Sequence, residues 1–89
     1  MFGCQMRKFT FYTDEIDTDY LDQKNPQMAA GVFAISNWKR KNFDECMYVM
    51  ENAKNIGFVT MHDYHNLSVR IKITGEMSEE EYVLYRLKY

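Results

Sequence analysis

A chain of 89 residues is long enough for one packed domain and too short for two independent cores. Hydrophobic residues make up 46% of it and aromatic residues 16%, which excludes disorder over the whole chain. The formal net charge of −2 gives no global electrostatic reason to bind nucleic acid. We therefore expect residues 1–89 to form a single domain, with residues 1–5 as a flexible tail.

Two strands and a long connection are predicted in the first part of the chain. Residues 7–13 alternate Phe9 and Phe11 with polar residues, which is the period of a half-buried strand. The acidic connection that follows, residues 14–27, contains the only proline, and connections of this length often have a function. Residues 30–36 are apolar throughout and predict a central strand, with a buried helix as the alternative.

Residues 42–57 form the clearest predicted helix, because apolar side chains recur there at steps of three and four residues. Asn42 and Glu45 have the spacing of a capping box at its start. Gly57 is the residue expected to end it, since glycine adopts the left-handed conformation that commonly stops a helix.

Two further strands are predicted at residues 58–62 and 67–74, with a turn between them. The second, LSVRIKIT, has the most regular alternation in the chain, with its aliphatic residues expected inside and its polar residues outside. Gly75 is expected to end this strand.

The last segment, residues 79–89, is compatible with two structures. Ser78 and Glu81 have the spacing of a capping box, which predicts the start of a helix. As a strand, the same residues would alternate and pair with residues 67–74 in a hairpin. The acidic first turn and the basic residues near the end suit a helix dipole, so the helix is favoured.

These elements, in the order β-β-α-β-β-α, predict an α+β fold. We expect a four-stranded, mostly antiparallel sheet with both helices on one face. The opposite face would then present the polar rows of the strands, where a binding site is expected.

Crowded carboxylates beside a tyrosine make the acidic segment the first candidate site. They could bind a basic surface of another protein, or they could belong to a solvated loop. A hard cation is a third reading, but the segment lacks the glycine and the closing glutamate of an EF-hand, so no metal site is predicted. The residues proposed for partner binding are Asp14, Glu15, Asp17, Asp19, Tyr20 and Asp22.

Basic residues interleaved with aromatic rings form the second candidate. Single-stranded nucleic acid is bound by this combination, because cations contact phosphates and rings stack on bases. An ordinary solvated sheet face has the same composition, and neither an RNP-like nor a GXXG pattern is present. The residues concerned are Trp38, Lys39, Arg40, Lys41, Arg70 and Lys72.

Evidence for catalysis in the sequence is weak. His62 and His65 could contribute to a ribonuclease-like acid–base site or to half of a zinc site. The remaining zinc ligands are missing from the sequence, and it has no phosphate-binding glycine loop or nucleophile elbow. We therefore predict no enzymatic activity, no cofactor and no metal.

The location expected from the sequence is the cytoplasm. Cys4 and Cys46 have no metal-ligand spacing, and neither a signal peptide nor a membrane span is recognisable. The chain is rich in Lys, Asn, Tyr, Met and Asp and has one proline, a usage common in A+T-rich genomes, including those of many phages. For a phage protein, the cytoplasm would be that of the host cell.

The function predicted is that of a small non-enzymatic regulator or inhibitor that binds another protein through an acidic, aromatic surface. A single-stranded nucleic-acid-binding protein that uses a basic sheet face is the alternative. A homodimer is compatible with both, because a short chain with an open sheet edge gains from pairing.

Overall fold

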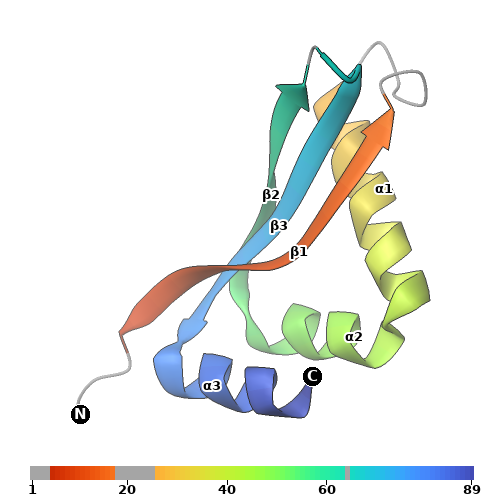
Figure 1. Cartoon of the computed structure of the whole chain (residues 1–89). Helices are drawn as coiled ribbons and strands as arrows, with labels where there is room; N and C mark the ends of the chain where they lie inside the picture. Colours follow the sequence, from red (N-terminus) through yellow and green to blue (C-terminus); the bar gives the residue numbers. More distant parts are fainter. Residues whose placement is uncertain (1–4, 18–25, 64) are drawn as a thin grey trace.

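The computed structural model describes residues 5–17, 26–63 and 65–89, so residues 1–4 of the expected tail lie outside it. The elements are strand β1 (Met6–Asp17), helices α1 (Pro26–Lys41) and α2 (Phe43–Asn52), strands β2 (Lys54–Asp63) and β3 (Ser68–Ser78), and helix α3 (Glu79–Lys88). The strands form one antiparallel sheet in the order β1-β3-β2 (Figure 1).

This arrangement is an α+β fold, but the predicted four-stranded sheet with two helices is wrong. Within the described residues, the sheet has three strands and is accompanied by three helices. The predicted order β-β-α-β-β-α is replaced by β-α-α-β-β-α, because a segment expected to be a central strand is part of α1.

β3 is the central strand, and its alternation decides which face of the sheet is inside. Val69, Ile71 and Ile73 are buried, while Arg70 and Lys72 between them are exposed. The predicted orientation of these five residues is confirmed. Toward the ends of the predicted strand the expectation is wrong, because Leu67, expected inside, is exposed, while Ser68 and Thr74, expected outside, are buried. Burying one row of aliphatic side chains fixes the register, because a slip by one residue would expose all of them.

β3 continues through Gly75, where the sequence predicted its end. Gly75 pairs with Phe9 within the ladder. A Cβ atom at this position would lie 3.1 Å from the ring of Phe11 and 3.3 Å from the Cβ of Ala53. The glycine therefore allows β1 and the end of α2 to pack closely over the strand.

β1 has an irregularity in its pairing with β3 between Thr10 and Tyr12. Phe9 pairs with Gly75 and Tyr12 with Ile73, so both side chains lie on the same face of the sheet. A strict alternation would place them on opposite faces, and an inserted residue removes that constraint. Tyr12 is thereby directed toward α1.

α1 replaces the central strand predicted at residues 30–36, which is wrong. Ala30, Ala34 and Trp38 are completely buried and recur at steps of four residues, as one face of a helix does. Val32 lies on the exposed side of the same helix. Its apolar side chain made the segment look buried on both faces.

The helix predicted over residues 42–57 is shorter than expected. α2 ends at Asn52, and Gly57 lies inside β2 instead of ending the helix. Asn42 precedes α2 but makes no side-chain capping hydrogen bond, so the predicted capping box is wrong. Cys46 is completely buried, as its place in the apolar pattern predicted.

α3 confirms that the last segment is helical. The Glu81 N–H donates a hydrogen bond to the Ser78 hydroxyl oxygen at 3.2 Å, and the Ser78 N–H donates to the Glu81 carboxylate at 3.4 Å. These two bonds are the predicted capping box. The strand alternative for this segment is therefore excluded.

The helices are distributed unevenly along an elongated molecule of 48 × 23 × 22 Å. α1 lies behind one half of the sheet and contacts all three strands, whereas α2 and α3 gather at the other end (Figure 1). Within the described ranges, the front of the sheet in this view carries no helix. None of the described helices is long and apolar enough to cross a membrane.

Candidate protein-interaction surfaces

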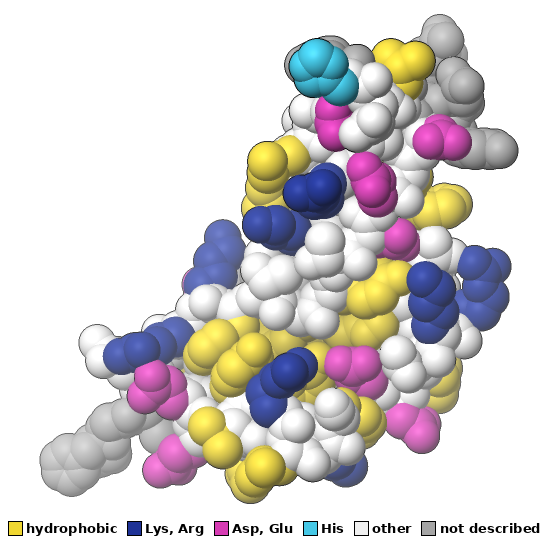
Figure 2. All heavy atoms as spheres, in the orientation of Figure 1, with side chains coloured by type: hydrophobic (Ala, Val, Ile, Leu, Met, Phe, Trp, Pro, Cys, Tyr) yellow, Lys and Arg dark blue, Asp and Glu magenta, His cyan; other side chains and the backbone are white. Residues whose placement is uncertain are grey.

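The face of the sheet opposite α1 is the first exposed surface, and Figure 2 shows it from the front. Its rows follow from the strand register, in which Arg70 lies between Glu15 on β1 and Met61 on β2. We call this surface the open sheet face. Its members are Thr13, Glu15, Asp17, Val59, Met61, Asp63, Arg70 and Lys72.

Charges of both signs are mixed on the open sheet face. Glu15 is paired directly with Arg70 across the ladder, and its carboxylate accepts a hydrogen bond from the Ser68 hydroxyl at 2.7 Å. Opposite charges at directly paired positions offset each other. Figure 2 shows Lys and Arg side chains beside Asp and Glu side chains over the strands. The surface therefore offers no continuous track of one charge.

The acidic segment predicted to bind a partner is divided between two faces of β1. Asp14 faces α1, where its Oδ2 accepts hydrogen bonds from the Tyr12 hydroxyl at 3.2 Å and from Asn37 Nδ2 at 2.9 Å. Glu15 and Asp17 are exposed on the open sheet face. Outside the described residues lie the other three members, Asp19, Tyr20 and Asp22.

The Tyr12 side chain links β1 to α1. Its ring stacks on Trp38 with the centroids 5.4 Å apart and the planes 8° from parallel. Burial raises the pKa of Tyr12 to about 12, and the negative charge of Asp14 adds to the shift. The phenol is thus held neutral, and its O–H donates a hydrogen bond to the carboxylate.

The residues predicted to bind nucleic acid are split between the two layers of the fold. Trp38 is completely buried against Tyr12, so its ring has no free face for a base. The basic triplet 39–41 is exposed at the end of α1, whereas Arg70 and Lys72 are exposed on the open sheet face. Because α1 lies behind the sheet, these two basic groups do not form one surface (Figure 1).

His62, His65 and Arg70 do come together, at a shallow depression beside the β2–β3 turn that Asp63 also lines. The Asp63 carboxylate accepts hydrogen bonds from Asn66 Nδ2 at 2.9 Å and from the His65 N–H at 3.0 Å. The bonds from Asn66 are the main cause that lowers the pKa of Asp63. This carboxylate is engaged in shaping the turn. No group of metal ligands is present among the described residues.

α3 has a second apolar face, whose exposure the sequence analysis did not anticipate. Val83, Leu84 and Leu87 are 54%, 61% and 79% exposed, while Tyr85 is the buried residue of the helix. Their spacing places the three on one side of α3. We call them the α3 ridge. The signal in the sequence is the presence of two separate apolar stripes on one short helix.

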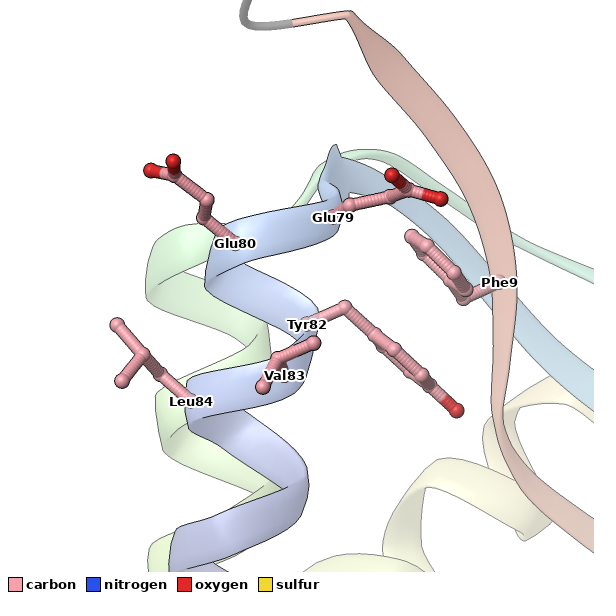
Figure 3. A pocket seen from close by; sticks show the side chains of 6 residues that line it. All are labelled: Phe9, Glu79, Glu80, Tyr82, Val83 and Leu84. Atoms are coloured by element: carbon pink, nitrogen blue, oxygen red, sulfur yellow. The ribbon is translucent and has the colours of Figure 1, made fainter.

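A groove adjoins the α3 ridge and separates it from β1 (Figure 3). The rings of Phe9 and Tyr82 stack there, with centroids 3.9 Å apart and planes 4° from parallel. Val83 lies beside these rings, and Leu84 projects from α3 on the side away from Phe9. The groove is lined by Phe9, Glu79, Glu80, Tyr82, Val83 and Leu84.

Aromatic contacts behind the α3 ridge hold the helix on the sheet. The Tyr85 ring meets Phe11 edge-on at 5.4 Å and stacks with Tyr48 at 6.2 Å. The Tyr85 hydroxyl donates a hydrogen bond to the Glu45 carboxylate. Burial raises the pKa of Tyr85, and this hydrogen bond adds to the shift. α3 is therefore anchored while its opposite side is exposed.

Comparison with known proteins assigns no role to either surface. No protein family model, no curated protein and no solved structure matches this chain. The two surfaces are therefore distinguished by their chemistry. The open sheet face is a mixture of charged and apolar side chains, whereas the α3 ridge is apolar and has an acidic margin at Glu79 and Glu80.

Proposed function

We propose that this chain is a small non-enzymatic regulator that acts by binding another protein, with the α3 ridge and its groove as the docking surface. The observation that carries the proposal is the exposure of more than half of each ridge side chain, on a helix anchored from behind. Contiguous apolar surface of this kind is typical of sites of protein contact.

The residues that border the groove indicate what kind of protein segment would bind there. Glu79 and Glu80 border the groove, and the stacked rings of Phe9 and Tyr82 form part of its lining. A protein segment that presents apolar side chains flanked by lysine or arginine would match both properties. The groove beside the ridge is thus acidic and aromatic, although it lies apart from residues 14–17 of the acidic segment.

The described part of the acidic segment, residues 14–17, is less suited to this role. Asp14 accepts hydrogen bonds from two side chains of the same molecule, and Glu15 accepts one from Ser68 while it is paired with Arg70. A partner would have to replace interactions that already exist. Binding of nucleic acid is disfavoured for a different reason, since the predicted stacking residue Trp38 is buried.

Affinity capture with a ridge variant tests this function. The tagged chain is used to recover proteins from a lysate of its source, with and without nuclease. The variant Val83→Gln/Leu84→Gln replaces two of the three side chains of the α3 ridge without adding charge, and glutamine keeps the helix propensity high. Val32→Gln is the matched control, because Val32 is 60% exposed on α1, at the other end of the molecule.

We expect a protein that survives nuclease treatment, is lost with the double variant and is retained by the control. Recovery that is equal for all three chains would contradict the proposal. Partners that disappear on nuclease treatment would instead favour a nucleic-acid-binding protein, and the exposed Arg70 and Lys72 would then be the residues to replace.

A further inference from the structure

Charge is distributed along α3 in a way that restricts what can pack on its ridge. The first turn is acidic, with Glu79, Glu80 and Glu81, and the last turn is basic, with Arg86 and Lys88. The apolar ridge lies between these two ends. The helix runs from residue 79 to residue 88, so its midpoint falls between Val83 and Leu84, at the ridge itself.

A helix with this pattern is complementary to an antiparallel copy of itself. In an antiparallel pair, each acidic first turn faces the basic last turn of the other helix, and the two ridges meet across the centre. The two helix dipoles are also opposed in this orientation, which is favourable. A parallel pair would bring acidic turns together at one end and basic turns together at the other.

The geometry points to a second copy of this chain as the partner of the α3 ridge, bound through two antiparallel α3 helices related by a twofold axis. This inference rests on the proposed function, because it uses the same docking surface: the weakly bound second copy covers the ridge when no other protein occupies it. A twofold contact of this type uses the same patch on both molecules and closes after two copies.

The surroundings of α3 permit such a contact. Leu84 projects away from β1, so a second helix can approach it without displacing the strand (Figure 3). At the other end, the Lys88 amino group lies 5.2 Å from the ring centre of Tyr48 and 5.6 Å from that of Tyr89. These contacts keep positive charge at the end of the helix.

α1 offers a comparison within the same molecule. It also exposes apolar side chains, with Met28 and Val32 on its outer side. Its last turn is basic, but its first turn contains no acidic residue. Two antiparallel copies of α1 would therefore leave their basic ends without a complementary partner. Self-complementarity distinguishes α3 from α1.

The size of the contact sets the expected strength. Two helices of ten residues each bury less surface than a stable dimer interface, so the pairing is weak and depends on concentration. Analytical ultracentrifugation from micromolar to millimolar concentration measures it. We expect the mass to rise from 10.7 kDa toward about 21 kDa, twice the monomer mass.

Charge reversal tests the orientation. Glu79 and Arg86 are two turns apart on one side of the ridge, so in the antiparallel pair Glu79 of each copy faces Arg86 of the other. The ion pair that Glu79 makes with Arg7 in its own chain is solvent-exposed and therefore opposes this contact only weakly. Glu79→Lys alone and Arg86→Glu alone place like charges together at both contacts. We expect each to raise the dissociation constant by about tenfold, because both symmetric contacts change sign.

Mixing these two variants restores opposite charges at both contacts, so the mixed dimer should form about as readily as the wild-type dimer. Arg7→Gln is the control for Glu79, since it removes the ion pair of 2.7 Å between Arg7 and Glu79 without touching the ridge. Leu84→Gln should abolish dimerisation, and Val32→Gln should not change it.

A wild-type chain that remains monomeric over the whole range would overturn the inference, and so would a dimer unaffected by Leu84→Gln or by the charge reversals. Failure of the inference is separable from failure of the proposed function. A monomer that still captures another protein in a ridge-dependent manner refutes the self-pairing alone. A chain that captures no other protein refutes the regulatory function, whether or not it dimerises.

Discussion

α1 and α3 pack against the same sheet, yet they use their apolar side chains differently. α1 buries the small residues Ala30 and Ala34 together with Trp38, and its backbone comes close to β2. α3 buries one residue, Tyr85, and is held through ring contacts while its ridge is exposed. The α1 end is therefore closed by the chain itself, and the α3 end leaves apolar surface for a partner.

The largest loss of stability is expected at the α1 end, where the chain itself buries the apolar side chains. Trp38→Ala removes a completely buried ring and its stack on Tyr12, and we expect it to lower the free energy of unfolding by about 3–5 kcal/mol. Denaturant titration followed by circular dichroism measures the loss. A loss below about 1 kcal/mol would show that α1 is not the closed end of the molecule.

The close approach of α1 to β2 predicts a smaller loss. A Cβ atom at Gly31 would lie 2.4 Å from the Phe58 ring, so the ring must move in Gly31→Ala. Overpacking lowers the free energy of unfolding by about 1–3 kcal/mol. The higher helix propensity of alanine raises it by at most about 1 kcal/mol.

A double-mutant cycle with Phe58→Leu measures the coupling. We expect Gly31→Ala to destabilise the chain less when the Phe58 ring is absent, because the overlap is then relieved. Strict additivity of the two substitutions would be evidence against a tight contact between α1 and β2.

Alkaline pH should weaken the same end of the molecule. The pKa of Tyr12 is raised from 10.0 to about 12 by folding, so the neutral phenol is the form that the folded state favours. Its contribution is complete below pH 10 and is lost as the pH rises from 10 toward 12. The free energy of unfolding should therefore fall more steeply with pH in the wild type than in Tyr12→Phe. An equal pH dependence of the free energy of unfolding in the wild type and in Tyr12→Phe would contradict this prediction.

The smallest effect is expected at the open end. Val83→Gln/Leu84→Gln should change the free energy of unfolding of the monomer by less than about 0.5 kcal/mol, because these side chains are already exposed. The measurement is made below the concentration at which copies associate. If the double variant were strongly destabilised, the α3 ridge would belong to the folding core and could not be a docking surface.

The parts of the fold that were predicted correctly are those with a local cause. The alternation of Val69, Ile71 and Ile73 predicted which face of β3 is inside, and the capping box of Ser78 and Glu81 predicted the start of α3. Both signals lie within a few residues of the structure they describe. They do not depend on what the rest of the chain does.

The errors arose where distant partners decide the structure. The helical spacing of apolar residues continues past Asn52 into β2, and pairing with β3 is what ends the helix. The residue at the irregular start of β2, Asn55, has a positive φ of 52°, which no local pattern predicted. At residues 30–36 the strand was favoured over the helix alternative because Val32 is apolar but exposed.

The candidate site was equally dependent on distant contacts. Asp14 and Glu15 were expected in a loop, yet Asn37 and Ser68 bind their carboxylates far along the chain. The α3 ridge was present in the sequence as a stripe of aliphatic residues. Whether a stripe is covered depends on the neighbouring elements, and that information is absent from local spacing.

The central position of β3 has a consequence for how this protein is made. Of the three described strands, β3 is synthesised after β1 and β2, yet β1 and β2 pair only through it, from Met6 with Ser78 at one end of the ladder. None of the sheet can form on the ribosome before residues 68–78 have emerged. Until then, the apolar faces of β1 and α1 are exposed to water. This exposure favours slow folding and the recruitment of chaperones during translation.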